Sequence, residues 1–518
     1  MRTRPAVWLL FLGIAFFSVT GCRKDAPAPS DRKPVMVLTG TDVSTFDPQI
    51  PFEVESSYVL NNIFETLVDF DSSFHLSPRL AVRWTNPDDR TWRFYLNENA
   101  RFSDGSMLKA SDVAFSINRL KSLVHSDLQG FTEHIDSIQV VDAHTVEIKS
   151  SGPVSILNNL VFIPIMSEKQ VREAGDGIGE KPMGTGPYRL VKWQKKKSIW
   201  LASNPYYQPR PEVQEVEFHI SEDPEKVLDD ILRLKPDLAM YIPFRKLDEF
   251  EKKKTNDLHV VTSNGLAVEY VVFNIRPSAP DFKGKNPLSD VNFRRALAYA
   301  TDRDSIIQSV LKGFGRPASQ VIAPEIFGYN PEIKTPEVDL SKSRRLLAQT
   351  DYSPEVKIPV YTLEGGSYRL ENSLINQWNK IGVKGTLRIW KDVAEMNRAL
   401  NTGAFAVTIQ AYTCTSGDAS EFLTFSLHTL DEKNGYGRGN YAGYSNVDLD
   451  RIAESNLHIL SPRSRLQMLQ RGMQIVAQDL PYLPLVISPD IYIVSDRIKW
   501  APAVNGELKL GDISFRNL

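Results

Sequence analysis

The stretch WRFYLNENARFSDGSMLKASDVAFSINRL, residues 92–120, decides how the rest of the sequence is interpreted. Apolar Trp92, Phe94 and Leu96 occupy every second position, which is the pattern of a strand with one buried face. The Ser-Asp-Gly-Ser segment at 103–106 then predicts a turn, because Gly tolerates positive φ and an Asp side chain can bond its own backbone two residues on.

A helix is expected directly after this turn. Ser111 is placed to cap it, and Asp112 in its first turn is favourable to the helix dipole. The apolar positions recur at helical spacing: Val113, Ala114, Ile117 and Leu120. Strand, tight turn and capped helix in 29 residues predict an α/β protein.

The exact order of residues in this stretch is more informative than its apolar periodicity. The phrase FSDGSMLKASDVAFSINRL closely resembles the signature of the family 5 solute-binding proteins, the extracytoplasmic receptors of peptide- and nickel-type ABC importers. Further phrases resemble the same family along most of the chain: TFDP at 45–48, IFETLVDFD at 63–71, PRLAVRW at 78–84, GTGPYRLVKW at 184–193, NPYY at 204–207, the segment 289–318, GNYAGYSNVDLDRI at 439–452 and DLPYLPL at 479–485.

This resemblance implies an α/β, two-lobed periplasmic-binding-protein-like fold of the cluster C type. It also implies an extra subdomain in the first lobe and two segments that cross a hinge, near Tyr270–Asn274 and near Leu485–Ile491. The expected boundaries are 35–270 for the first lobe with an inserted subdomain at 74–183, 271–487 for the second lobe, and 488–518 for a return segment that completes the first lobe.

Composition narrows the classes of function. The chain has 518 residues, of which 42% are hydrophobic, so it has ample material for large packed cores. Its 61 basic and 63 acidic residues leave a net charge of −2, which gives no indication of a nucleic-acid surface. Gly-x-Ser-x-Gly, His-Glu-x-x-His and Cys-x-x-Cys motifs are absent from the sequence, so we expect no enzyme; a secreted carboxylate-pair hydrolase and a purely structural lipoprotein are the remote alternatives.

The N-terminal sequence is typical of an export signal. Arg2 and Arg4 precede an apolar run at 6–19 that is shorter than the roughly 20 residues a permanent span needs. Val-Thr-Gly-Cys then resembles a bacterial lipobox, which implies a signal peptide at 1–21, lipid on Cys22 and a Pro-rich tether at 22–34. We therefore expect an exported protein anchored to the membrane and facing the periplasm or the cell exterior. A cleaved but unlipidated signal and an uncleaved anchor are the alternatives.

The resemblance also indicates where a ligand lies. By position, Asp42, Val43 and Ser44 fall in a first-lobe loop whose backbone lines the cleft in the family. Peptide-binding members carry Gly-Trp-x-x-Asp in a second-lobe loop, and that Asp pairs with the ligand ammonium, since an unpaired buried charge is costly. Here Tyr412 replaces the Trp and Thr415 replaces the Asp, so the ammonium anchor is missing.

Other residues remain candidates around this altered loop. Asp418 could take over the anchor through a loop shift, or serve only as the turn residue of its own loop. Arg369, beside Tyr368, lies where family members present Arg to acidic ligand groups, and Cys414 belongs to the same second-lobe loop. Cys414 with His428 gives little support for a metal, so we predict no metal site and no cofactor.

We therefore expect a monomeric substrate-binding lipoprotein of an ABC importer. It would capture a peptide or peptide-like solute between its lobes by hinge closure and deliver it to a permease whose separate subunits hydrolyse ATP. The alternatives on the same scaffold are a neutral or acidic non-peptide ligand, such as an oligosaccharide or an opine, and a metal chelate.

Overall fold

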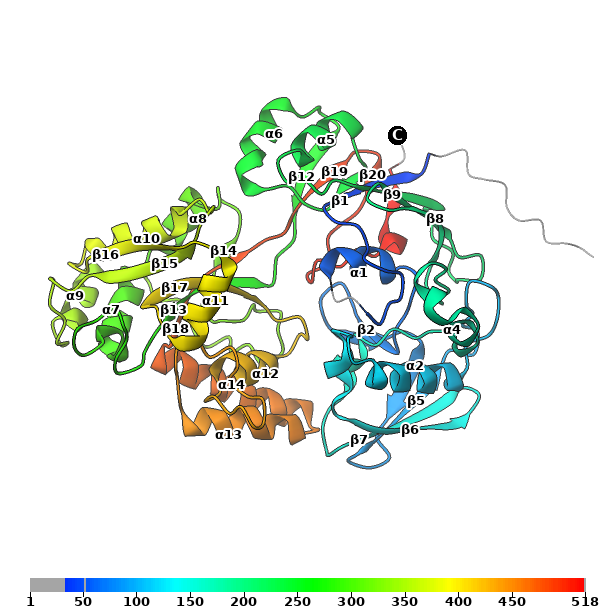
Figure 1. Cartoon of the computed structure of the whole chain (residues 1–518), viewed down its shortest axis with the longest axis horizontal. Helices are drawn as coiled ribbons and strands as arrows, with labels where there is room; N and C mark the ends of the chain where they lie inside the picture. The colour runs from blue at the N-terminus through cyan, green and yellow to red at the C-terminus, as the bar shows by residue number, and fades with distance from the viewer. Residues whose placement is uncertain (1–32, 51–52, 517–518) are drawn as a thin grey trace, which may run out of the picture. The chain divides into compact units, whose positions relative to one another are not determined.

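The computed structural model describes residues 33–50 and 53–516, and three sheets dominate it (Figure 1). The predicted signal peptide, Cys22 and nearly all of the tether lie outside the described residues.

The first large sheet has seven strands in the order β12-β19-β11-β1-β10-β9-β8. β1 pairs in parallel with β10 and β11, while the other pairs are antiparallel. The strands are β1 (Val35–Thr39), β8 (Tyr188–Gln194), β9 (Ser198–Ser203), β10 (Glu215–Ile220), β11 (Leu238–Ala239), β12 (Leu258–Thr262) and β19 (Ile491–Ser495). The helices of this part are α1 (Val54–Leu60), α3 (Leu157–Leu160), α4 (Glu168–Ala174), α5 (Val227–Leu234) and α6 (Leu247–Lys253).

The stretch 92–120 lies in a smaller antiparallel sheet of order β4-β5-β7-β6. Its strands are β4 (Ala81–Thr85), β5 (Thr91–Leu96), β6 (Ile135–Asp142) and β7 (Thr145–Ser150), and α2 (Ala110–Ser122) packs on it. Trp92, Phe94 and Leu96 are all buried, so the alternation predicted the buried face of β5 correctly. Two short hairpins flank the sheets: β2 (Val68–Phe70) with β3 (Leu76–Pro78), and β20 (Ile498–Lys499) with β21 (Ser514–Phe515).

The start of α2 differs from the prediction. Ser111 was expected to cap the helix, but α2 already begins at Ala110 and its N-cap is Lys109. The Asp112 carboxylate accepts a hydrogen bond of 2.9 Å from the Lys109 backbone N–H and another from the Glu168 backbone N–H. Asp112 therefore satisfies backbone donors from the third helical position, and no side-chain cap is needed at Ser111.

The second large sheet has six strands in the order β14-β18-β13-β17-β15-β16. Asp290 and Asp302 cap α7 and α8 through their side chains. The strands are β13 (Ala267–Phe273), β14 (Arg316–Pro317), β15 (Ile358–Leu363), β16 (Gly385–Trp390), β17 (Val407–Thr413) and β18 (Tyr482–Ser488). The helices are α7 (Val291–Ala300), α8 (Arg303–Ser309), α9 (Leu340–Leu347), α10 (Arg369–Asn379), α11 (Val393–Thr402), α12 (Ala419–Phe422), α13 (Val447–Ser455) and α14 (Pro462–Asp479).

The chain passes between the two large sheets twice, at 263–266 and at 489–490. The first passage precedes the expected segment, because Tyr270 already lies inside β13 and pairs with strands on both sides. Ser263 and Asp490 bind each other at these passages: the Ser263 hydroxyl donates to the Asp490 carboxylate over 3.0 Å and accepts from the Asp490 N–H over 3.1 Å. The two crossing segments are thus joined side by side.

The phrases shared with the family contact one another in space. Arg119, at the end of the opening stretch, pairs with Asp47 over 2.5 Å. Gly184 and Gly186 lie so close to the backbone at Ile63 that a Cβ on Gly184 would come within 1.9 Å of the Ile63 carbonyl oxygen. These phrases build the scaffold of the first lobe.

Candidate functional site

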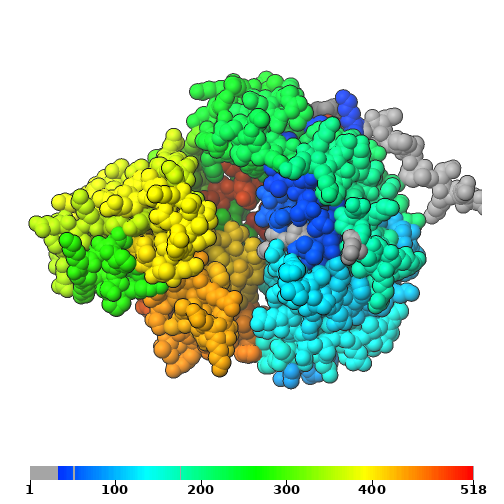
Figure 2. All heavy atoms as spheres, in the orientation of Figure 1, coloured from blue at the N-terminus to red at the C-terminus, as the bar shows by residue number. Residues whose placement is uncertain are grey.

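A cavity of about 450 Å³ lies beside α1 and the segment that follows it. Most of its wall comes from the first lobe, including the β2–β3 hairpin and the C-terminal segment 505–512, whereas the second lobe contributes Leu266, Thr413 and Thr415. Figure 2 shows a hollow in this face of the molecule, with atoms of the C-terminal part (red) at its back.

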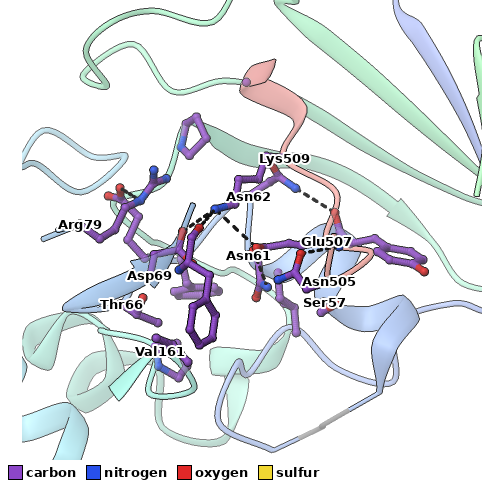
Figure 3. Close-up of a pocket in the computed structure, with 18 of the residues that line it drawn as sticks. Ser57, Asn61, Asn62, Thr66, Asp69, Arg79, Val161, Asn505, Glu507 and Lys509 are labelled. Atoms are coloured by element: carbon purple, nitrogen blue, oxygen red, sulfur yellow. Dashed lines mark hydrogen bonds and ion pairs between the residues drawn. The ribbon is translucent and has the colours of Figure 1, made fainter. Parts of the chain in front are cut away.

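Asn62 fixes the C-terminal segment against α1 and so builds one wall. Its buried amide donates to the carbonyls of Tyr58 and Leu508, over 2.9 and 2.7 Å, and its carbonyl oxygen accepts from the Leu510 N–H over 2.9 Å. This brings Glu507 and Lys509 to the cavity, where Figure 3 shows them beside Asn61 and Asp69.

Two carboxylates share one ammonium in this wall. Lys509 Nζ lies 2.8 Å from Asp69 Oδ2 and 3.5 Å from Glu507 Oε2, and it also donates to the Phe70 carbonyl over 2.6 Å. The Asn61 amide donates to Glu507 Oε1 over 3.1 Å. Burial, together with the negative charge of Asp69, raises the pKa of Glu507.

A second ion pair stands further along the same wall. Arg79 Nε lies 2.7 Å from Glu65 Oε1, and only 8% of the Glu65 side chain is exposed. Burial raises the pKa of Glu65 even though Arg79 opposes the shift, so this carboxylate loses more hydration than one guanidinium replaces. The Arg79 guanidinium also lies 5.9 Å from the centre of the Tyr207 ring.

Of the nine predicted ligand-binding residues, all within the described ranges, Thr415 alone lines this cavity, and it is exposed. Tyr412, near the end of β17, and Cys414 and Asp418, in the loop that follows, face inward. The Tyr412 hydroxyl donates to Glu421 over 2.5 Å, and burial raises the pKa of the Cys414 thiol, which is free and lies 3.1 Å from the Asp418 carbonyl oxygen.

Asp418 is committed to its own lobe. Its carboxylate is 5% exposed, pairs with Arg465 and accepts hydrogen bonds from the Ser420 N–H and hydroxyl, over 3.0 and 2.7 Å. It thereby caps α12. In this conformation no oxygen of Asp418 is left for a ligand ammonium.

The remaining predicted residues lie away from the cavity wall. Asp42 accepts from the Trp193 indole and from the Lys196 N–H, so its carboxylate fastens the β8–β9 turn, while Val43 is buried and Ser44 is exposed. Tyr368 and Arg369 stand at the start of α10, where Arg369 is exposed. The structure therefore does not bring the three predicted groups together at one site.

Sequence reasoning missed the charged wall formed by Glu65, Asp69, Arg79, Glu507 and Lys509. One signal was available: Glu65 interrupts the otherwise apolar run IFETLV, and a charge within such a run needs a partner when it is buried. Nothing in the local sequence linked it to residues 507–509.

Across 33–50 and 53–516, no group of three or more His, Cys, Asp or Glu side chains is arranged to hold a metal ion. In the same ranges, every helix is too short or too polar to cross a bilayer.

The chain is similar to known proteins both in sequence and in fold. The chain is 24% identical to heme-binding protein A of Haemophilus influenzae over 92% of its own length and 88% of that protein, and 24% identical to the dipeptide-binding protein of Escherichia coli over 85% and 86%. Its fold matches the solved structure of HbpA2 from Haemophilus parasuis with a TM-score of 0.80 at 22% identity, covering 93% of this chain and 99% of that one.

The family model described as bacterial extracellular solute-binding proteins, family 5, middle, matches residues 75–434, more than half of the chain. Similar proteins that the comparisons found are solute-binding proteins rather than enzymes. The two large sheets, the two crossings and the inserted small sheet agree with the two-lobed fold expected. The chain therefore belongs to family 5 of the bacterial extracellular solute-binding proteins.

Proposed function

We propose that this protein is the extracytoplasmic receptor of an ABC importer and captures a peptide or peptide-like solute in the 450 Å³ cavity. The observation that carries the proposal is the cavity itself, which combines aromatic and charged side chains and is contributed mostly by one lobe with a strip from the other. Its volume falls within the range of about 300–1,000 Å³ typical of small-molecule sites. The similarity to the dipeptide-binding protein of Escherichia coli supports the same class of ligand.

The passages at 263–266 and 489–490 are where we place the hinge. Closure of the second lobe would bring Thr413 and Thr415 against a solute held by the first-lobe wall, and the closed form would be the one that the permease recognises. The passages move the expected boundaries from 270 and 487, so we propose 35–262 for the first lobe, with 74–183 as the inserted subdomain, 263–488 for the second lobe counted from the first passage, and 489–518 for the return segment. Among the predicted site residues, Thr415 is the one we propose to contact the solute.

Anchoring is proposed from sequence alone. The lipobox at Val19–Cys22 supports cleavage after residue 21 and lipid on Cys22, so that a monomeric receptor is held at the membrane. Mass spectrometry of the N-terminal peptide of the exported protein tests this: a diacyl or triacyl mass on Cys22 is expected, and an unmodified Cys22 or an intact residue 1 contradicts it.

Thermal unfolding of the exported protein tests the binding proposal. A solute that binds only the folded state stabilises it by about 2.7 kcal/mol at 100 times its Kd. Short peptides are expected to raise the melting temperature, whereas oligosaccharides and nickel chelates at equal concentration are not. Stabilisation by a sugar or chelate but by no peptide would replace the proposed ligand class.

A further inference from the structure

The charge on the cavity wall suggests which chemical group the solute presents there, an inference that rests on the proposed function. Six acidic side chains line the cavity against three basic ones. The acidic residues are Glu53, Glu65, Asp69, Glu212, Glu507 and Asp512, and the basic ones are Arg79, Arg210 and Lys509. The wall therefore carries an excess of negative charge, and a solute of opposite charge would be attracted to it.

Part of the excess lies at Lys509, in a poorly hydrated part of the wall. Arg79 and Glu65 form a one-to-one pair, but Lys509 serves both Asp69 and Glu507. Lys509 Nζ stays 3.5 Å from Glu507 Oε2, beyond the usual length of an N–H···O hydrogen bond. The Glu507 side chain is only 13% exposed, so water does little to compensate it.

The second lobe supplies no charge to this cavity. Leu266, Thr413 and Thr415 are its contributions, and all three are neutral. The acidic group that peptide-binding relatives would present at Thr415 is missing, while Asp418 is held by Arg465. Negative charge that could meet a ligand cation therefore stands on the first-lobe wall.

We propose that the solute carries an ammonium or guanidinium group that binds the Asp69–Lys509–Glu507 cluster of the first-lobe wall through the two carboxylates. The cation would supply the second positive charge that the Asp69–Lys509–Glu507 cluster lacks. Aromatic rings adjoin the same space, since Phe70 and Phe74 line the cavity with ring centres 4.3 Å apart, and they would cover the apolar part of the solute. Thr415 would contribute a hydrogen bond on closure but would not select for charge.

Isothermal titration with four matched peptides tests this. The probes are Ala-Ala-Ala amide with a free amine, its N-acetyl form, N-acetyl-Ala-Lys-Ala amide and N-acetyl-Ala-Glu-Ala amide. We expect the two cationic probes to bind and the neutral and acidic ones to bind at least tenfold more weakly, since a charged hydrogen-bonded contact is worth about one to two orders of magnitude in affinity.

Single substitutions test which residues contact the cationic group of the probes. Glu507→Gln and Asp69→Asn are expected to weaken the cationic probes about tenfold or more. Thr415→Val should reduce all binding probes by a similar, small factor. Glu432→Gln, which removes one exposed charge outside the cavity lining, is the matched control for net charge and should change nothing. Circular dichroism confirms folding, and two separate substitutions guard against the failure of one.

The outcomes separate the two proposals. If the neutral or acidic probe binds as tightly as the cationic ones, or if Glu507→Gln and Asp69→Asn both bind like Glu432→Gln, the inference is overturned while the receptor function stands. If none of the four probes binds, the peptide-receptor function is overturned and the inference falls with it.

Discussion

Thr415 and Asp418 stand three residues apart in one loop, yet only Thr415 reaches the cavity. The loss of a ligand-anchoring carboxylate at Thr415 was predictable, because it is visible at a single position of the sequence. The cluster around Glu507 was not, since Asn61 and Glu507 are 446 residues apart and Asp69 and Lys509 are 440 apart. Which polar residues meet at such separations is decided by the packing of whole elements, and no local pattern encodes it.

Asp418→Asn should destabilise the protein rather than abolish binding. The substitution leaves the buried Arg465 guanidinium without its counter-charge, and breaking a buried pair in this way costs about 3–5 kcal/mol. Urea unfolding measures the loss. Asp448→Asn, which disrupts the exposed pair with Arg451, is the control and should unfold like the unaltered protein. An Asp418→Asn protein of normal stability that no longer binds peptides would restore Asp418 as the ligand anchor.

Protonation of Glu269 is expected to make the stability of the protein depend on pH. Burial raises its pKa, the Ser488 hydroxyl that donates to it only partly opposes this, and the negative charge of Glu371 adds to the rise. The folded state thus holds the proton more tightly than the unfolded state, whose pKa is about 4.3. The stabilising effect of protonation is complete below that value and is lost as pH rises through the folded pKa.

Glu269→Gln, which stays neutral and can still accept from Ser488, removes this dependence. We expect the variant to exceed the unaltered protein in free energy of unfolding at pH 7 and the difference to shrink as the pH falls towards 4. Urea titrations at several pH values measure it, with Glu432→Gln as the exposed control. A difference that is constant with pH would show that Glu269 does not titrate in this range.

Helices and strands were predicted correctly from the sequence where a single local pattern determines them. The buried face of β5 follows from its apolar period, and α2 follows the predicted turn with its apolar positions at helical spacing. The start of α2 was misplaced because Asp112 accepts from the N–H groups of both Lys109 and Glu168, and Glu168 is 56 residues away. The first crossing was misplaced because periodicity marks a strand but not the sheet to which it belongs.

Gly184→Ala tests the close approach of the backbone at Gly184 to the backbone at Ile63. A Cβ at this position would come within 1.9 Å of the Ile63 carbonyl oxygen, and backbone on both sides leaves no flexible group to yield. We expect a loss of about 3 kcal/mol or more in the free energy of unfolding. Gly130→Ala, with nothing within 4 Å of the added carbon, is the matched control. Equal stability of the two variants would show that the 62–64 segment moves away at little cost.

At the scale of the whole molecule, one short C-terminal segment belongs to both large sheets. β18 lies between β14 and β13 in the second sheet, and β19 lies between β12 and β11 in the first. Both strands are almost entirely buried. The two lobes are therefore not independent in sequence, although each has its own sheet.

A chain that ends at Pro481 should fail to form either large sheet. Removal of β18 and β19 takes an interior strand from each sheet and exposes apolar side chains on both sides of the gap. Limited proteolysis and circular dichroism measure the outcome, with a chain lacking only the last two residues as control. A protease-resistant second lobe in the chain that ends at Pro481 would contradict this view.

The position of these two strands also sets an order of events in time. A chain that emerges with its N-terminus first, from a ribosome or through a membrane channel, has neither sheet complete until about residue 495 is free. Until then the pairs of β18 with β13 and of β19 with β11 and β12 cannot form, and sequence separations of roughly 200 residues or more make their closure slow. The topology thus leaves both large sheets incomplete until this segment has emerged, so each lobe reaches its final form only in that late step.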